Sequence, residues 1–474
     1  MPDASFRYSA RVKGVHSVIQ TLSAPGRVVG LLAAIVAAVL GVGVANPAFL
    51  AWGSLAGVLT AVAPIVILGV GVGLVVIAGE IDISVGSLFG TLAALLAVLA
   101  SPTHAAWPVW LSVLIVALAG GAAGLVNGAL TVYGRVPSIV VTLGTLSILR
   151  GVTEFILGGA WVTDLPPGLR VLGTGAIANI PLAVWAAAAV VFGGWWLSRR
   201  TRLGVQMYAV GDSVHAARYA RIRSGRVKML AFTISGALVG VAVVMSVPQL
   251  SVVESGLGIG MELAAVTAIV VGGVSISGGR GSLLGVAAAA VLLGLVRPAL
   301  IFVPRAFAES GTRDIGASNV ASNIASWEQA VHGACILLAV LLDRSASSRA
   351  TPMDAVATRQ TPPWGLAGLL AAVLLAARWA SPEFVNAGVQ ADLLPQLAEI
   401  ALLAVPMTLI LLTGGIDLSV GSAMALAAVA AIPRSTGRRW SGLELLGGAR
   451  RQDTRHHGPQ PAELQARPGH CTGC

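Results

Sequence analysis

The sequence predicts an all-α polytopic membrane protein with about ten transmembrane helices in its first three hundred and forty or so residues. Hydrophobic residues make up 56% of the 474 positions, and charged residues make up only 11%. A soluble domain carries about 25% charged residues because water must hydrate its surface. Hydrocarbon is therefore the expected solvent, and apolar runs of the roughly 20 residues that a spanning helix needs recur along the chain.

Ten apolar runs before residue 345 are predicted to span the bilayer, and two of them are short enough to be tilted or broken. The predicted spans are 28–45, 54–77, 86–100, 107–132, 137–157, 178–197, 227–247, 259–276, 281–303 and 327–342. The first run begins near Val28, behind several basic residues, and no small-residue cleavage site follows it. We interpret this run as a retained span rather than a signal peptide.

The distribution of lysine and arginine predicts the orientation, because positively charged loops resist translocation. With the N-terminus in the cytoplasm, seventeen basic residues fall on cytoplasmic segments up to the start of the second apolar block. The outer loops before residue 345 hold only three, which are Arg170, Arg305 and Arg313. We therefore expect a cytoplasmic N-terminus.

An internal repeat predicts the domain organisation. The stretch Ile81–Ser87 (IDISVGS) recurs 335 residues later as Ile416–Ser422 (IDLSVGS). The even number of predicted spans between the two stretches indicates a parallel duplication rather than an inverted repeat. The predicted parts are a complete membrane domain, a cytoplasmic linker, a truncated second copy with spans at 364–380 and 390–412, and a tail. Their bounds are 1–345, 346–362, 363–432 and 433–474.

The tail has a composition unlike the rest of the chain and no helical or strand periodicity. We interpret it as disordered or as an out-of-frame reading of a GC-rich gene. Its terminal Cys471 and Cys474 have the spacing of a zinc-binding pair, but a lone pair at a chain end lacks a folded frame. No metal site is predicted.

Polar residues inside apolar segments are the candidate functional residues, since lipid rejects them and they are expected to face the helix bundle. Asp82 and Ser84 precede an apolar run. Two compatible interpretations stay open: one of them caps the helix that begins near Val85, or both line a translocation path. Asn127, Thr142, Thr145, Glu154 and Glu262 are further members of this group, although the two threonines are expected to bond to a carbonyl of the preceding turn.

Glu262 is predicted to lie near the outer end of its span, after a glycine-rich stretch, where it could meet a transported solute. The alternative is a carboxylate favoured by the helix dipole at a helix start. Glu80 is interpreted as a residue of the cytoplasmic edge without a specific role.

The longest cytoplasmic loop, 198–226, is basic and contains a candidate docking helix. Asp212 or Ser213 is suited to begin a short helix that runs to Tyr219. The chain lacks the Gly-x-x-x-x-Gly-Lys-Ser/Thr loop that binds ATP phosphates, because its only lysines are Lys13 and Lys228. ATP hydrolysis by that route is excluded, and no catalytic residue and no cofactor are predicted.

Four ordered motifs resemble the permease family of ribose-type and related ABC importers over residues 28–345, and again over 364–432. The first is the repeated Gly-x-Ile-Asp-Ile/Leu-Ser-Val-Gly-Ser. The second combines Asn127-Gly128 with the run Val136–Thr145. The third is Ala209–Arg218, which is similar to the family's cytoplasmic coupling segment. The fourth is Gly272–Ser282, which is similar to its late glycine-rich loop.

The resemblance implies a permease subunit that moves a sugar or sugar-like solute across the bacterial inner membrane. It implies cytoplasmic ATPase subunits, a periplasmic sugar-binding protein and a second permease subunit as partners, within a lipid bilayer and without nucleic acid. The substrate-path candidates are then Asp82, Ser84, Asn127, Thr142 and Glu262. The candidates for the ATPase coupling segment are Gly211, Asp212, Ala216, Ala217 and Arg218.

Two other functional interpretations stay open. An ion-coupled secondary carrier would use Asp82 and Glu262 as coupling sites. A truncated fusion that inserts but transports nothing would follow if the incomplete second copy is inactive.

Overall fold

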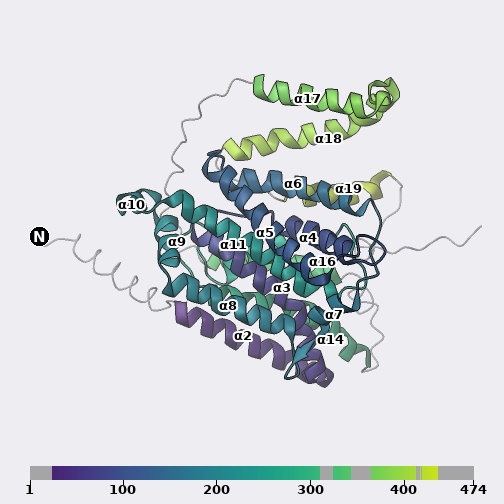
Figure 1. Cartoon of the computed structure of the whole chain (residues 1–474). Coiled ribbons are helices and arrows are strands. Elements are labelled where there is room, and N and C mark those ends of the chain that lie inside the picture. Colours follow the sequence, from purple (N-terminus) through teal and green to yellow (C-terminus); the bar gives the residue numbers. More distant parts are fainter. Residues whose placement is uncertain (1–23, 310–323, 343–363, 413–416, 418, 436–474) are drawn as a thin grey trace, which may run out of the picture. The chain divides into compact units, whose positions relative to one another are not determined.

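The computed structural model describes residues 24–309, 324–342, 364–412, 417 and 419–435 (Figure 1). The chain divides into two compact units, Met1–Arg349 and Ala350–Cys474. The predicted linker and nearly all of the predicted tail, from residue 436 onward, lie outside the described residues. The two units are described separately.

The first unit is almost entirely helical. Its elements are α2 (Ala24–Ala45), η1 (Pro47–Leu50), α3 (Trp52–Ile77), α4 (Val85–Ala100), α5 (Val109–Val132), α6 (Ser138–Leu157), α7 (Pro167–Thr174), β1 (Ala176–Ile177), β2 (Ile180–Pro181), α8 (Leu182–Arg200), α9 (Arg202–Asp212), α10 (Val214–Tyr219), α11 (Ser224–Ser246), η2 (Val247–Gln249), α12 (Met261–Val271), α13 (Leu283–Gly294), α14 (Val296–Glu309) and α16 (Ile324–Leu342). The two short strands form an antiparallel hairpin. The prediction of an all-α membrane protein is confirmed.

Helix α3 forms the centre of the unit. It is buried from Val62 to Ile77 apart from the partly buried Ile65, and α8, α11, α12 and α13 pack around it. Helix α5 packs closely on α11, because Gly120 and Gly124 face the backbone of Gly236 and Phe232 with no side chain between them. Small residues at such interfaces let helix backbones approach where lipid offers no hydrophobic drive. The core therefore consists of tightly packed, largely apolar helices.

Seven helical segments of the first unit's described residues are long and apolar enough to cross a bilayer, and an eighth lies in the second unit. Helix α4, with 16 residues, is shorter than these spans, as the sequence suggested for two of the runs. The predicted span at 259–276 is helical only in part, because α12 has only 11 residues and covers about 16 Å at 1.5 Å per residue. It begins after Gly260, whose φ is 84°, and ends at Gly272.

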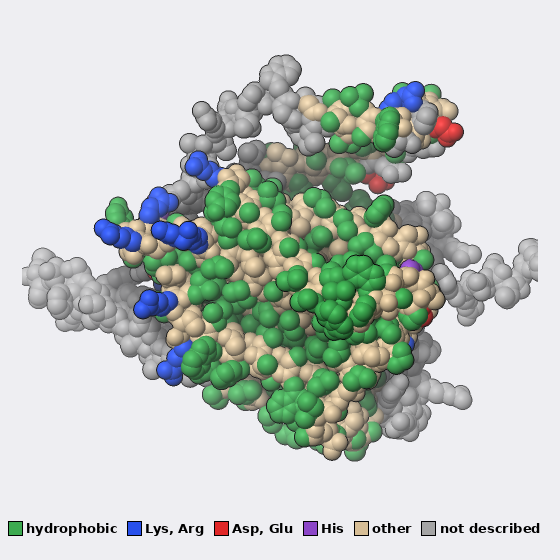
Figure 2. All heavy atoms as spheres, viewed as in Figure 1, with side chains coloured by type: hydrophobic (Ala, Val, Ile, Leu, Met, Phe, Trp, Pro, Cys, Tyr) green, Lys and Arg blue, Asp and Glu red, His purple; other side chains and the backbone are tan. Residues whose placement is uncertain are grey.

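The surface separates apolar and basic regions. Figure 2 shows hydrophobic side chains over most of the visible face, while Lys and Arg gather at the end where Figure 1 labels α9 and α10. We call this the basic end. Its arginines lie at the end of α8, on α9 and α10, at the start of α11, and on the loop that contacts Asp212; they are Arg199, Arg200, Arg202, Arg218, Arg223, Arg226 and Arg280. Large apolar side chains of the outer helices are exposed, such as Val36 of α2 at 57% and Phe155 of α6 at 88%. Such exposure suits contact with lipid.

The second unit contains α17 (Trp364–Ala380), η4 (Pro382–Val385), α18 (Ala387–Leu412) and α19 (Val420–Ser435). Adding 335 to the bounds of α3 and of α4 reproduces the bounds of α18 and of α19. The Asp417 carboxylate accepts from the Ser419 backbone N–H at 2.8 Å and from its hydroxyl at 2.6 Å. Asp82 and Ser84 make the same pair of bonds in the first unit.

Candidate functional site

The loop between α3 and α4 carries a buried carboxylate. Asp82 Oδ1 accepts from the backbone N–H of Ser84 at 3.0 Å and from its hydroxyl at 2.6 Å. The exposed fractions of Asp82 and Ser84 are 2% and 0%. A buried carboxylate is expensive unless hydrogen bonds satisfy it, so the loop conformation and the acid support each other.

Asn127 extends this pair into a chain across three segments. Its Nδ2 donates to Ser84 Oγ at 2.9 Å, and its Oδ1 accepts from the Thr145 hydroxyl at 2.7 Å. We call Asp82, Ser84, Asn127 and Thr145 the polar chain. It ties the 78–84 loop to the last third of α5 and to α6, although the four residues lie up to 63 positions apart in the sequence. The structure thus brings together three of the predicted path residues, and all three are buried.

The prediction that Asp82 or Ser84 caps α4 through its side chain is wrong. Ser84 is the N-cap residue of α4, but its side chain makes no capping bond. Its hydroxyl donates to Asp82 instead, and the Asp82 carboxylate accepts from Ser84 itself rather than from the N–H groups of the first helical turn. Asn127, which approaches from another helix, accounts for the difference, because it occupies Ser84 Oγ as an acceptor.

Two of the three threonines of α6, Thr142 and Thr145, behave differently. The Thr142 hydroxyl lies 3.3 Å from the carbonyl oxygen of Ile139 in the preceding turn and 3.5 Å from that of Ile81, which confirms the expected carbonyl bond. Thr145 bonds across helices to Asn127, contrary to that expectation. Ser138 was missed: its Oγ accepts from the Ile81 N–H at 3.2 Å. Its place directly after Pro137, at the start of α6, was the available signal.

Glu262 lies deep in the unit and not near the outer end of a span, so that prediction is corrected. It is the second residue of α12, and Val271 at the other end of this helix adjoins the 272–282 loop of the basic end. Nine residues of helix place Glu262 about 14 Å from that end, roughly half of a 30 Å hydrocarbon layer. The chain reaches it through the irregular segment 250–260.

The starts of the two short helices α4 and α12 meet at this depth. A Cβ added to Gly86 would overlap Glu262 Oε2 and would lie 2.6 Å from the Gly258 carbonyl oxygen. Glu262 Oε1 accepts from the Gly260 N–H at 3.3 Å, whereas Oε2 is buried and has no hydrogen-bond partner among the described residues. Ser87 Oγ is also buried and has no hydrogen-bond partner among the described residues. Two helices that begin inside the bundle, with unsatisfied polar atoms beside them, resemble the broken helices that bind solutes in transporters.

Arg150 of α6 is a further residue that sequence reasoning did not single out as functional. Its Nη1 donates to the Leu257 carbonyl oxygen at 3.2 Å and so holds the segment that leads to Glu262. Its charge within a predicted span was the signal that could have found it.

The predicted coupling segment joins the 78–84 loop through backbone alone. A Cβ on Gly211 would overlap the Ile77 carbonyl oxygen and would lie 2.5 Å from the Gly279 nitrogen. The Gly279 N–H donates to that same Ile77 carbonyl oxygen at 3.0 Å, and Gly79 and Gly278 also pack here. We call Gly79, Gly211, Gly278 and Gly279 the glycine junction. No side chain fits between these two loops and the end of α9, so the three segments are expected to move together.

The remaining coupling candidates lie on α9 and α10. Ser213 accepts from the Ala216 N–H at 3.2 Å and caps α10, which confirms the predicted start of this helix. Ala217 is buried at 2%, while Asp212, Ala216 and Arg218 are exposed. Asp212 Oδ1 lies 3.7 Å from Arg280 Nη2 of the late loop.

Glu80 has a partner, contrary to its interpretation as an edge residue without a role. It forms an ion pair with Lys228 near the start of α11, and the two side chains are 12% and 19% exposed. This pair fixes the same loop to a fourth segment. Among the described residues, no group of three or more His, Cys, Asp or Glu side chains could hold a metal ion.

Comparison with known sequences identifies the family to which the chain belongs. Residues 54–340 match the sequence model of a family described as branched-chain amino acid transport system / permease component. The autoinducer 2 import system permease protein LsrC of Klebsiella pneumoniae is 37% identical over 240 residues, which cover 51% of this chain and 69% of that protein. The protein of the same name from an Enterobacter species is 38% identical over 241 residues, which cover 51% of this chain and 69% of that protein. The one from Yersinia pseudotuberculosis is 32% identical over 239 residues, which cover 50% of this chain and 67% of that protein. No solved structure matches the chain.

Proposed function

Since the chain belongs to the family of branched-chain amino acid transport system permease components, we propose that it is the membrane-spanning subunit of an ATP-driven importer for a sugar-like solute. The main support for the proposed mechanism is the way the 78–84 loop is attached at both ends. One end of this loop lies in the glycine junction with the coupling segment, and the other end lies in the polar chain. A movement at the membrane edge would therefore reach the polar chain inside the bundle through seven residues.

The basic end is proposed to face the cytoplasm, with the N-terminus on the same side. Supporting this are the gathering of Arg and Lys around α9 and α10 (Figure 2) and the resistance of such segments to translocation. The ATPase subunits would then dock on α9 and α10, where the exposed Asp212, Ala216 and Arg218 offer a polar surface. A periplasmic binding protein would deliver solute at the opposite end, and a second permease subunit would complete the path.

Closure of the ATPase subunits would displace α10 and the glycine junction as one body. The 78–84 loop would follow, because Gly79 cannot separate from Gly211 and Gly278 without opening a void between backbones. The polar chain is closed in the present conformation, and its opening would turn Ser84, Asn127 and Thr142 toward a solute. This is alternating access, in which the permease contributes shape and polar lining.

A hydroxylated solute fits the polar groups present. Hydroxyl and amide side chains both donate and accept hydrogen bonds, and they dominate the polar chain. The unsatisfied Glu262 Oε2 and Ser87 Oγ could accept from and donate to further solute hydroxyls when the gap between α4 and α12 widens. The relatives named for autoinducer 2 import support a small-solute importer of this class.

We further propose that residues 364–435 are a partial second copy of the permease domain. The constant offset of 335 between element bounds and the recurring Asp–Ser bond pair support this. Its described helices correspond to α2, α3 and α4 alone, so transport would rest on the first unit.

Reconstitution of the full chain with its ATPase and binding protein tests the function. Solute uptake should require ATP and should persist with a protonophore present. Uptake that an uncoupler abolishes while ATP stays high would favour an ion-coupled carrier that uses Asp82 and Glu262.

The coupling route is tested in the same system with a cysteine placed at Ser84, in a background that lacks the native cysteines. Ser84→Cys should react with a membrane-permeant thiol reagent faster during ATP turnover than at rest. Gly211→Ala should abolish this difference, since the added methyl group would force the loops apart. Equal reaction rates at rest and in turnover would contradict the proposed opening.

A further inference from the structure

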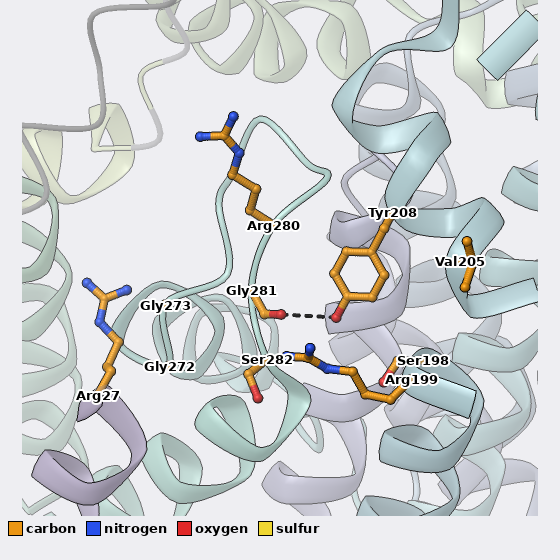
Figure 3. Close-up of a pocket in the computed structure, with 10 residues that line it drawn as sticks. All are labelled: Arg27, Ser198, Arg199, Val205, Tyr208, Gly272, Gly273, Arg280, Gly281 and Ser282. Atoms are coloured by element: carbon orange, nitrogen blue, oxygen red, sulfur yellow. Dashed lines mark hydrogen bonds between the residues drawn. The ribbon is translucent and has the colours of Figure 1, made fainter. Parts of the chain in front are cut away.

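A cavity of about 700 Å³ opens at the basic end, and none of the residues that line it belongs to the polar chain. It is lined by the ends of α2, α8 and α13, by part of α9 and by the loop before α13. Figure 3 shows three arginines among its lining side chains: Arg27 from α2, Arg199 from α8 and Arg280 from the loop. No acidic residue lines it among the described residues, and Arg280 also pairs with Asp212 outside the lining at 3.7 Å. The described lining of the cavity is therefore basic.

The backbone of the cavity adds to this charge. Ser282, which lines it, is the N-cap residue of α13 and makes no side-chain capping bond. The first N–H groups of a helix lack partners within the helix and carry a partial positive charge. The Tyr208 hydroxyl donates to the Gly281 carbonyl oxygen at 3.0 Å (Figure 3), which holds the loop in place beneath Arg280. Arginine forks and a helix start are the groups that bind phosphate oxygens in proteins.

The position of the cavity favours a lipid headgroup over free phosphate as its ligand. Both α2 and α8 pack on α13, and their outward faces are apolar and exposed, as at Leu32 (51%) and Phe192 (62%). Phe192 lies within 6.3 Å of the rings of Trp195 and Trp196, and the Arg200 guanidinium lies 6.0 Å from the Trp195 ring. Aromatic and arginine side chains mark the depth of lipid headgroups.

We propose that this cavity binds the phosphate group of an anionic phospholipid, with Arg27, Arg199 and Arg280 as its ligands. The acyl chains would run along the apolar faces of α2 and α8. Basic pockets between transmembrane helices on the cytoplasmic side are suited to such headgroups. Because Arg280 belongs to the loop of the glycine junction, a bound headgroup would also brace the coupling route.

The test measures binding of single lipids to the purified full chain in neutral detergent, by native mass spectrometry and by thermal shift. Phosphatidylglycerol should bind and stabilise, whereas phosphatidylcholine should do so much less. The variant Arg27→Gln/Arg199→Gln/Arg280→Gln should weaken phosphatidylglycerol binding by about a hundredfold. The charge-matched control Arg202→Gln/Arg223→Gln/Arg226→Gln changes arginines at the same end but outside the cavity, and it should keep most of the binding.

A triple Arg→Lys variant at the cavity separates lost binding from lost folding. It keeps the charge but not the planar fork, and it should retain part of the affinity with an unchanged melting temperature in the absence of lipid. Inorganic phosphate forms the second arm. If phosphate binds with the same dependence on the three arginines and the lipids show no preference, the phosphate chemistry stands and the lipid source is wrong. Equal losses in the cavity and control variants would overturn the proposal.

Discussion

The Asn127 side chain donates to the Ser84 hydroxyl at 2.9 Å and accepts from the Thr145 hydroxyl at 2.7 Å. Through Asn127, a helix in the wall of the bundle holds the loop that carries the buried Asp82. The same loop is held at its other end by Gly211, which lies in the segment proposed to receive the ATPase subunits. The two attachments explain why a glycine and an asparagine 84 positions apart are expected to affect one process.

Asn127→Ala removes the centre of the polar chain and leaves the Ser84 and Thr145 hydroxyls without this partner. Stability should fall by about 1–3 kcal/mol, the usual effect of orphaned buried polar groups, and ATP-dependent uptake should fall at least about tenfold. Thermal unfolding in detergent and solute uptake measure the two effects. Ser147→Ala is the matched control, because this exposed hydroxyl bonds only within its own helix; similar behaviour of the two variants would contradict the role of Asn127.

Gly86→Ala tests the close approach of α4 to α12. The added methyl group would overlap Glu262 and the Gly258 carbonyl oxygen, so overpacking should destabilise the protein by about 1–3 kcal/mol. Gly144→Ala in α6 meets no atom within 4 Å and should be neutral or should stabilise by about 0.5–1 kcal/mol. The order of the two melting temperatures is the readout, and a melting temperature of Gly86→Ala at or above that of Gly144→Ala would refute the packing.

The Glu80–Lys228 ion pair is suited to a double-mutant cycle. Lys228→Met leaves the mostly buried Glu80 carboxylate without its counter-charge and should destabilise more than the double variant Glu80→Gln/Lys228→Met. The coupling free energy should exceed the 0–1 kcal/mol typical of exposed pairs, because the side chains are only 12% and 19% exposed. Additive single effects in the unfolding data would show that the pair contributes nothing.

Asp164, in the connection between α6 and α7, predicts a pH dependence. The Thr103 hydroxyl beside Asp164 holds the pKa of its carboxyl group below the usual range, with a smaller contribution from Ser101. A pKa that is lower in the folded state than in the unfolded state adds stability above the unfolded value, near 3.9 for aspartate, and this stability is lost as the pH falls through the folded value. Asp164→Asn should therefore lower the melting temperature at pH 7, and the difference from the parent should shrink toward pH 3. A constant difference would contradict the assignment.

Ending the chain after Arg349 tests the partial second copy. The first unit contains the polar chain, the glycine junction and all helices that meet them. Uptake by the shortened chain should stay within about twofold of the full chain, because no contact of the proposed mechanism is removed. Loss of uptake with normal membrane insertion would show that residues 350–474 take part in transport.

The local features of the candidate site could be predicted from the sequence, but the depth of its residues within the helix bundle could not. The motif Ile81–Ser87 identified Asp82 and Ser84 as candidates. Ser213 could be recognised as the start of a helix because capping depends on neighbouring residues alone. Glu262 was placed wrongly, since hydropathy joins α12 to its flanking glycine-rich segments into one apparent span of 18 residues. Glu80 and Arg150 were undervalued because their partners lie 148 and 107 positions away in the chain.

Composition, apolar run length and charge asymmetry by themselves determined that this is a polytopic helical membrane protein, and four short motifs determined its family. These properties depend on short stretches of sequence or on sums over the whole chain, so they can be recognised without knowledge of the fold. Only the tertiary structure decided that two helices begin inside the bundle, that Asn127 rather than a helix cap satisfies Ser84, and that the coupling segment meets the Asp82 loop through glycine backbone. Such contacts join residues far apart in sequence, and they depend on which helix faces pack together once lipid and neighbouring helices have selected one arrangement.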